Sequence, residues 1–408
     1  MNAPVGTGPG SVDAHFRAAV TELVLASHTM NPGALAATVN RAVATLGIDV
    51  NVLVIDYEQR ALRQLPDAGK PTPPATPVDS SPAGQAFASI TPRHDPERNR
   101  LWLPILDGTE RLGVLEVTLP HQLRGDDAAV RRGCEALAGL IGHLLQSKSG
   151  LGDGIEMARR SRPMSVASEL LLQLVPPTTF ACDQLVLSAV LEPTYDVGGD
   201  AFDYSVDGST ARVAIFDALG HGLPACLTSS VAVSAIRTAR RTGQGLVEMG
   251  RAADTAIQSQ WTDLRFVTAV LAELDLDSGT LRYVNAGHPP PLVLRGRRVV
   301  HELAQGRRLP LGLDDPSDDV AEVMLVPGYR VLFYTDGVIE ARSLDSALFG
   351  RERLIERTER HARADLATAE ILRLLSHAVL EHQAGPLSDD ATLLLAEWSP
   401  NAARRARP

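Results

Sequence analysis

The chain has 408 residues, of which 44% are hydrophobic and only 4% aromatic, so we expect two or three domains with aliphatic cores. Its formal net charge of −10 argues against nonspecific binding to nucleic acid or to anionic membranes. The cysteines Cys134, Cys182 and Cys226 match neither a zinc-binding spacing nor a disulfide framework, which favours a reducing cytoplasm. Because no apolar run reaches about 18 residues and no signal-peptide pattern follows Met1, we expect neither a membrane span nor secretion.

The N-terminal third of the chain mixes helical and strand-like patterns. Residues 1–12 are rich in glycine and proline and predict a disordered N-terminus. The pattern that follows predicts helices over 15–30 and 33–46, a strand over 50–55, a proline-rich loop over 71–77, a hairpin over 101–105 and 112–117, and a long helix over 126–146. Together these elements predict one α/β domain over residues 13–148.

This predicted domain resembles the GAF family of sensory modules. The resemblance rests on the Leu-Pro-Ile of residues 103–105, the Leu-Gly-Val-Leu of residues 112–115 and the segment 81–86. It implies a binding site for an unknown small molecule or protein signal. A regulatory α/β domain of the PAS type is the alternative. His94 and His143 fit surface or core positions better than haem ligation.

Residues 149–178 are interpreted as a linker. The glycine-rich and serine-rich segment 147–154 predicts a flexible connection. A short helix is then expected over 163–175, with an apolar seam at near-heptad spacing formed by Met164, Ala167, Leu171 and Leu174. Since a helix of this length is too short for a stable coiled coil alone, it is either a transmission or homodimer helix or a cap on the second domain.

The C-terminal half returns to short strand-like runs that flank central helices. The predicted strands are 185–191, 201–205, 212–216, 266–274, 281–285, 292–294, 299–303, 320–325, 331–335 and 391–396, and the predicted helices are 223–241, 245–260, 353–359 and 366–382. Hairpin turns at 277–279 and 295–297 imply antiparallel pairing. We therefore predict an α+β domain over 179–398, built as an antiparallel β-sandwich flanked by helices, with a tail over 399–408.

Acidic residues recur where these predicted strands end. Asp217 follows the apolar run 213–216, Asp336 follows 331–335, Asp390 opens 391–396, and Asp200 closes a glycine-containing turn. An isolated Asp before glycine is usually a turn residue. Four acids at the ends of elements in one domain suggest instead that their side chains converge on one site. Gathered carboxylates would repel one another unless a cation intervened, and oxygen ligands suit Mg²⁺ or Mn²⁺.

A pair of such ions would favour hydrolysis of a phosphoryl ester, because together they activate water and attract an anionic group. No Gly-x-x-x-x-Gly-Lys-Ser/Thr motif is present, which disfavours nucleotide-driven transfer. A covalent hydrolase is also disfavoured, because there is no Gly-x-Ser-x-Gly and because Cys226 lies in a helical run where burial is expected.

Six ordered motifs carry a second resemblance. They are the Gly-Gly-Asp-Ala-Phe-Asp of 198–203, the Asp-Ala-Leu-Gly-His-Gly of 217–222, the Asn-Ala-Gly-His-Pro-Pro-Pro of 285–291, the Leu-Pro-Leu-Gly of 309–312, the Tyr-Thr-Asp-Gly-Val-Ile-Glu-Ala of 334–341 and the Ser-Asp-Asp-Ala-Thr of 388–392. In this order they resemble the SpoIIE/RsbU-type serine phosphatases, a bacterial branch of the metal-dependent (PPM) protein phosphatases. The resemblance spans residues 179–398.

The resemblance implies a role for each acidic position. Asp217 would bridge two metal ions, and the Ala218 carbonyl would bind one of them. Asp336 and Asp390 would complete the shell of the second ion, while Asp200 would hold metal-bound waters. Asp389 is a weaker candidate as a direct ligand. His221 is either the acid that protonates the leaving serine oxygen or a residue that packs at a helix start, and His288, in a proline-rich turn, is expected to be structural.

By the same resemblance, the expected activity is a Mn²⁺- or Mg²⁺-dependent phosphoserine/phosphothreonine protein phosphatase regulated by the N-terminal domain. The expected substrate is a phosphorylated STAS-type anti-sigma-factor antagonist in a partner-switching pathway. Two alternatives stay open. One is a binding module that keeps the fold without activity, against which the four intact acids count. The other is a metal-dependent phosphodiesterase for a small nucleotide, which the ordered motifs disfavour.

Overall fold

The computed structural model describes residues 9–67, 72–192, 195–196, 198–364, 366–383, 387, 389–400 and 402. Contacts divide the chain into two units, one ending at Arg162 and the other beginning at Pro163. Val197, Ser388 and most of the predicted tail over 399–408 lie outside the described residues. In the part of the chain that is described, none of the helices combines the length and apolar character needed to cross a bilayer.

The N-terminal unit is built on one antiparallel sheet of six strands in the order β3-β2-β1-β6-β5-β4. Its elements are α1 (Pro9–Ser27), α2 (Leu35–Ala42), β1 (Asp49–Ile55), β2 (Ala61–Gln64), β3 (Thr76–Pro77), α3 (Pro82–Ser89), β4 (Arg93–Asp95), β5 (Arg100–Asp107), β6 (Glu110–Thr118), α4 (Ala128–Ser149) and α5 (Asp153–Arg159), with two short 3₁₀ helices on either side of α2.

Both faces of this sheet are covered, as the alternation along β1 shows. Val50, Val52 and Val54 pack with α1, α2 and α4, whereas Leu53 and Ile55 pack with α3 on the opposite face. The two-residue period of a strand explains this division. The predicted α/β architecture therefore agrees with the structure, although α3, β2 and β4 were not predicted as elements.

Three predicted boundaries of this unit are wrong. Helix α1 already begins at Pro9, and Val12 is buried, so the folded unit starts before residue 13. The end of the predicted loop 71–77 forms the short edge strand β3, where a proline is tolerated because its missing N–H faces outward. The segment 147–154 is largely helical rather than a flexible connection, since α4 runs to Ser149 and α5 begins at Asp153. Helix α5 is held by Ile155, which is buried in the core.

The C-terminal unit is a sandwich of two six-stranded sheets. The first sheet has the order β15-β12-β11-β10-β9 with β16 on β12, and the second has the order β14-β13-β17-β18-β8-β7. The strands are β7 (Thr179–Cys182), β8 (Leu185–Glu192), β9 (Asp200–Asp207), β10 (Thr210–Ala218), β11 (Val267–Asp275), β12 (Thr280–Ala286), β13 (Leu292–Arg295), β14 (Arg298–Glu302), β15 (Arg307–Arg308), β16 (Ala321–Met324), β17 (Tyr329–Tyr334) and β18 (Ala391–Trp398).

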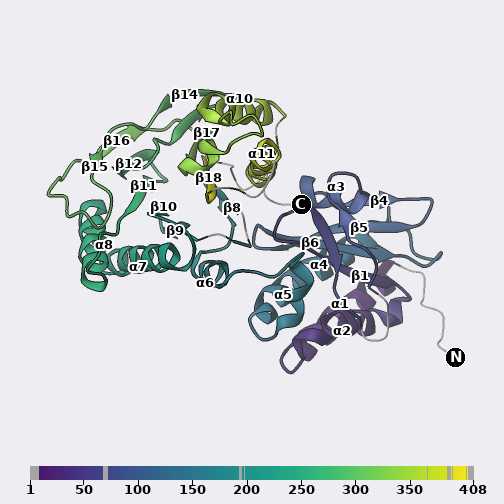
Figure 1. Ribbon diagram of the computed structural model, residues 1–408. Helices are drawn as coiled ribbons and strands as arrows, with labels where there is room; N and C mark the ends of the chain where they lie inside the picture. The colour runs from purple at the N-terminus through teal and green to yellow at the C-terminus, as the bar shows by residue number, and fades with distance from the viewer. Residues whose placement is uncertain are drawn as a thin grey trace. The chain divides into compact units, whose positions relative to one another are not determined.

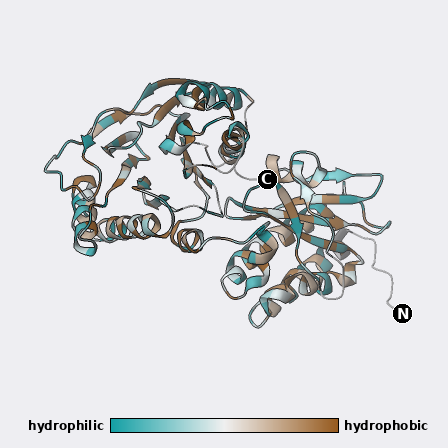
Figure 2. Ribbon diagram, in the orientation of Figure 1, coloured by the Kyte–Doolittle hydropathy of each residue, from teal (hydrophilic) through white to brown (hydrophobic). Residues whose placement is uncertain are grey.

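Helices cover the two outer faces of this sandwich. Helices α7 (Gly222–Arg241) and α8 (Leu246–Gln260) pack on the first sheet, while α9 (Asp336–Glu340), α10 (Gly350–Arg363) and α11 (Thr368–His382) lie by the second (Figure 1). Along β17, Val331 and Phe333 face the space between the sheets, whereas Leu332 and Tyr334 face α11. Apolar residues accordingly gather along the strands and on the inner sides of the helices (Figure 2). The predicted α+β sandwich is confirmed, except that the short β15 pairs with β12 in parallel.

The linker helix α6 (Val166–Leu174) belongs to the C-terminal unit. Its Ala167 and Leu171 are buried in the core of that unit, and the Cys226 thiol of α7 donates to the Ala167 carbonyl. Two members of the predicted seam therefore pack against α7, which favours the interpretation of this helix as a cap. Ala402, beyond the last strand, packs against Val186 of β8.

Candidate metal centre

The four predicted acids come from both sheets and meet at one end of the sandwich. Asp217 near the end of β10 is the direct register partner of Asp200, the first residue of β9. Asp336 opens α9 directly after β17, and Asp390 immediately precedes β18, which pairs with β17. The convergence predicted from isolated strand ends is thus present in the structure.

The electrostatic field of this cluster is strongly negative. Burial, followed by the charges of Asp336 and Asp389, raises the pKa of the Asp217 carboxyl to about 7. Burial and the charges of Asp217 and Asp390 raise the pKa of Asp200 well above its usual value. Burial raises the pKa of Asp389 and of Asp390 above the usual value, and the nearby exposed His221 opposes part of this rise in both carboxyls. Such a cluster favours the binding of protons or of metal cations, because the negative charge of each carboxylate disfavours ionisation of its neighbours.

Asp390 has a structural role that sequence reasoning missed. Its Oδ2 accepts backbone N–H groups from Gly198 at 2.8 Å, Gly199 at 2.5 Å and Asp200 at 3.2 Å. This carboxylate therefore fixes the turn that leads into β9, and one of its oxygens is fully used. Asp389 is exposed and interacts with Asp217 and Asp336, so it has the better access to a shared ion.

Two glycines let the acid-bearing segments approach one another. A Cβ built on Gly337 would overlap the carbonyl oxygen of Asp390, and one built on Gly198 would overlap the backbone nitrogen of Gly222. Both glycines are required by close backbone contact. The glycines beside Asp200 and Asp336 in the sequence motifs are therefore part of the site's packing.

Threonines that no motif argument selected contact two of the acids. The Thr335 hydroxyl donates to Asp200 Oδ2 at 2.7 Å and accepts the N–H of Thr392 at 2.8 Å. The Thr268 hydroxyl lies 3.3 Å from Asp217 Oδ2, on the strand that pairs with β10. The Thr335–Asp200 contact joins the two sheets, and the Thr268–Asp217 contact joins neighbouring strands of one sheet, so both could be found only once the fold was known.

The donor set fits a hard divalent ion in its chemistry. All five acids offer oxygen, and the buried Ala218 carbonyl follows Asp217 directly. Within the described residues, no three acidic, histidine or cysteine side chains are drawn together tightly enough to hold a metal by themselves. Asp200 and Asp390 each turn an oxygen toward protein donors.

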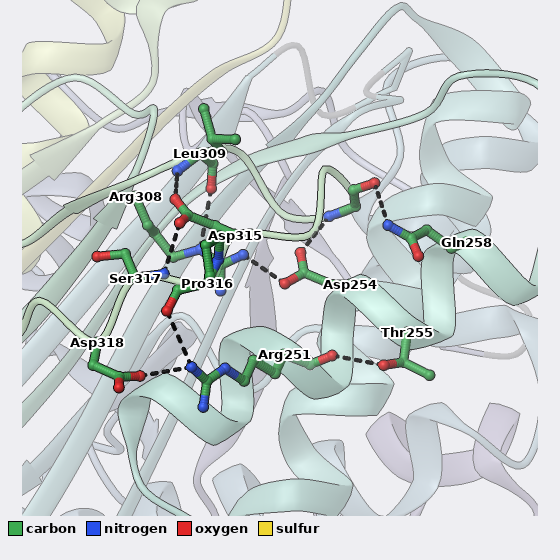
Figure 3. Close-up of polar contacts among 11 residues, drawn as sticks. Arg251, Asp254, Thr255, Gln258, Arg308, Leu309, Asp315, Pro316, Ser317 and Asp318 are labelled. Atoms are coloured by element: carbon green, nitrogen blue, oxygen red, sulfur yellow. Dashed lines mark hydrogen bonds and ion pairs between the residues drawn. The ribbon is translucent and has the colours of Figure 1, made fainter.

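Hydrogen bonds and an ion pair hold the Leu-Pro-Leu-Gly segment to α8 (Figure 3). Arg308 and Asp254 form a buried ion pair with N and O 2.6 Å apart, and Asp254 also accepts the N–H of Gly312 at 2.7 Å. Leu311 pairs with Val267, the residue opposite Ala218 in the first sheet. The motif thus forms a fixed rim next to the end of β10, with Leu309 half exposed.

A known protein family matches part of the C-terminal unit. Residues 207–399 match the family model described as Stage II sporulation protein E (SpoIIE). These residues form a SpoIIE-type domain. The resemblance inferred from the ordered motifs is confirmed for the C-terminal unit, although the Gly-Gly-Asp turn at 198–200 precedes the matched range. The GAF resemblance of the N-terminal unit stays a prediction.

Two curated relatives each align with about half of the chain. Protein IcfG of Synechocystis sp. is 25% identical over 240 residues, which cover 52% of this chain and 37% of that protein. Phosphoserine phosphatase RsbU of Bacillus subtilis is 23% identical over 214 residues, covering 52% of this chain and 63% of that protein. The alignments thus cover less than two thirds of either relative. The solved SiaA-PP2C domain of Pseudomonas aeruginosa is 24% identical, with a TM-score of 0.46, over 52% of this chain and 86% of that one.

Proposed function

We propose that the SpoIIE domain is a divalent-metal-dependent phosphatase that hydrolyses phosphoserine or phosphothreonine in a protein. The observation that carries this proposal is the convergence of five aspartates from both sheets at one end of the sandwich, with raised pKa values for Asp217 and its neighbours. The name of the relative RsbU, a phosphoserine phosphatase, supports the substrate class.

In this proposal Asp217, the Ala218 carbonyl, Asp336 and Asp389 would hold the divalent ions. This revises the role expected for Asp390, because Asp390 Oδ2 is committed to the Gly198–Asp200 turn. Bound there, Mg²⁺ or Mn²⁺ would activate a water and neutralise phosphoryl oxygens. From its buried position Asp200 would orient water, and the exposed His221 would give a proton to the leaving serine oxygen.

The proposed substrate is a phosphorylated STAS-type antagonist of an anti-sigma factor, following the family resemblance. The decisive experiment compares Mn²⁺-dependent phosphate release from such a phosphoprotein with hydrolysis of a cyclic dinucleotide by the same full-length chain. Release from the phosphoprotein alone supports the proposal. Hydrolysis of the dinucleotide alone would favour a phosphodiesterase, and turnover of neither would favour a binding module.

Removal of metal is expected to abolish turnover reversibly. The ligands are carboxylates and one carbonyl, a set from which Mg²⁺ and Mn²⁺ exchange readily, so exhaustive chelation should leave less than about 1% of the rate. Added Mn²⁺ should restore activity at least as well as Mg²⁺. Phosphate release measured before and after chelation checks this, and full activity in the chelated protein would contradict it.

Chelated protein should also lose stability as the pH rises. The folded-state pKa of Asp217, about 7, lies above the unfolded value of 3.8, so the unfolded chain gives up this proton first. The melting temperature of the metal-free protein should therefore fall between about pH 4 and pH 7, and Mn²⁺ should raise it more at pH 7.5 than at pH 5.5.

We further propose that the N-terminal unit is a GAF-like sensor that controls the phosphatase through α6. The Arg237 guanidinium supports a route from this helix to the centre, because it donates to the Leu174 carbonyl at the end of α6 and to Asp203 of β9. Strand β9 begins with Asp200. A shift of α6 would thus act on the strand that carries a site residue.

Deletion of residues 1–162 is expected to change the metal-saturated rate severalfold, with either sign. Leu170→Glu should reproduce part of that change, because Leu170 lies on the exposed side of α6. The seam residue Leu171 is unsuitable for this test, because it is fully buried and a charge there would unfold the domain. Equal phosphatase rates for the full-length, truncated and Leu170→Glu proteins would leave the N-terminal unit as a docking module without control.

A further inference from the structure

A buried histidine joins the two sheets directly beneath the acid cluster. His288 follows β12 in a turn where Gly287 has φ +70°, a left-handed conformation that suits glycine. The Asn285 side chain closes this turn, since its Oδ1 accepts the His288 N–H at 2.8 Å and its Nδ2 donates to the His288 carbonyl at 2.9 Å. The imidazole is only 5% exposed, so its direction is fixed by the fold.

The two ring nitrogens of His288 meet partners from different sheets. Nε2 lies 3.1 Å from the Tyr334 carbonyl oxygen of β17, and Nδ1 lies 2.8 Å from the Thr268 hydroxyl of β11. A carbonyl oxygen can only accept, so Nε2 carries the proton and Nδ1 accepts. Burial also lowers the pKa of His288 to about 3, in agreement with a neutral ring.

This tautomer determines where the single hydroxyl hydrogen of Thr268 points. If Thr268 donated to Asp217, the buried Nδ1 of His288 would lose its donor, and an unsatisfied buried acceptor is costly. The hydrogen is therefore directed to His288 Nδ1, 2.8 Å from the Thr268 oxygen, rather than to Asp217 Oδ2, which lies 3.3 Å from it. Asp217 then keeps both oxygens free to accept a cation.

The same contacts set the distance between two acids that lie on different sheets. Thr268 is the register partner of Asp217, and Tyr334 stands two positions before Asp336. His288 thus bridges the strand beside one acid and the strand that leads to the other. No hydrogen-bonded ladder joins β11 to β17 in the described sheets. The two hydrogen bonds of His288 therefore link the position of one strand directly to that of the other.

We propose that His288, as the tautomer protonated on Nε2, is a positioning residue that acts through Thr268 to keep Asp217 open toward a divalent cation at a fixed spacing from Asp336. This inference rests on the proposed metal centre and adds to it the residue that prepares its shared ligand. His288 touches neither substrate nor ion in this role. It acts only through its two hydrogen bonds.

The first test needs no variant. A long-range ¹H–¹⁵N spectrum of the metal-free, full-length protein should show His288 protonated on Nε2 and unprotonated on Nδ1. A pattern with the proton on Nδ1, or a charged ring near neutral pH, would overturn the proposal. Because this readout involves no turnover, it remains decisive even if the protein hydrolyses no phosphoprotein.

The second test measures Mn²⁺ affinity by calorimetry. His288→Leu removes both hydrogen bonds and should weaken Mn²⁺ binding by about 10- to 100-fold, the range seen when partners behind a metal ligand are lost. His288→Gln can donate to Tyr334 and accept from Thr268, so it should restore most of the affinity. His301→Leu, at an exposed position of β14, is the matched control and should bind as the parent protein does.

A double-variant cycle tests the route through Thr268. Thr268→Val removes the hydroxyl and keeps the shape, and adding it to His288→Leu should cost little further Mn²⁺ affinity, because both changes break one chain of contacts. Fully additive losses would overturn the proposed route. Unchanged Mn²⁺ affinity in a folded His288→Leu protein would reduce His288 to a packing residue. If the parent protein binds Mn²⁺ but releases no phosphate, the proposed activity fails while the His288 measurements still stand.

Discussion

Asp217→Asn is expected to lower metal-saturated turnover by at least about 10³-fold, or about 4 kcal/mol in the barrier, while the fold stays intact. Asp217 lies where β9, β10 and β11 meet, and its charge is the one that both proposed ions share. An amide keeps the shape but removes the charge, so metal retention and water activation both suffer. Phosphate release from the phosphoprotein, together with a melting curve, measures the two effects separately.

Three further substitutions make this prediction specific to the proposed ligand set. Asp389→Asn should behave like Asp217→Asn, whereas Asp390→Asn should mainly lower the melting temperature, because Asp390 fixes the turn before β9. His221→Ala should cost about 10²-fold, the low end for a general acid. If Asp217→Asn kept more than a few per cent of the parent rate, the shared-ligand assignment would be wrong.

Gly337→Ala is the other change expected to have a large effect, although it removes no functional group. The added methyl would overlap the Asp390 carbonyl oxygen, so the segment carrying Asp389 and the start of α9 with Asp336 must move apart. A displacement near 1 Å can cost about 10²-fold in rate, and forced overpacking costs about 1–3 kcal/mol in stability. We therefore expect both weaker Mn²⁺ binding and a lower melting temperature.

The matched control is Gly139→Ala in α4. There a Cβ meets nothing within 4 Å, so the same chemical change should leave activity unaltered and slightly favour the helix. Wild-type Mn²⁺ affinity and rate in Gly337→Ala would show that the two acid-bearing segments do not depend on this close approach.

Much of the C-terminal fold followed from local patterns. The apolar run before Asp217 predicted β10, and the helical spacing from residue 223 predicted α7, because each element has one clear periodicity. Short or edge elements were missed for the opposite reason. Strand β15 has two residues and is stabilised by pairing with β12, which no local pattern reveals.

The sequence predicted the location of the site better than it predicted the role of each residue in it. Strand ends located the acids, but two adjacent aspartates look alike in sequence, and only the hydrogen bonds of Asp390 separate its role from that of Asp389. The Thr268 and His288 contacts link residues of different strands, so they depend on tertiary placement. Similarly, the glycines around α5 predicted a flexible segment, whereas the structure has a helix there whose Ile155 is buried in the core.

Because the acids of the centre are divided between two sheets, a bound ion would act as a removable cross-link at one end of the sandwich. The opposite end, where Trp398 pairs with Tyr329 and its indole donates to the Leu276 carbonyl, is closed by protein contacts alone. Local opening should therefore be asymmetric. Backbone amides near Asp217 and Asp336 should exchange with solvent deuterium much faster after chelation, while amides near Trp398 should hardly respond. Proteolytic lifetime would then depend on divalent-cation supply, in addition to any change in catalysis.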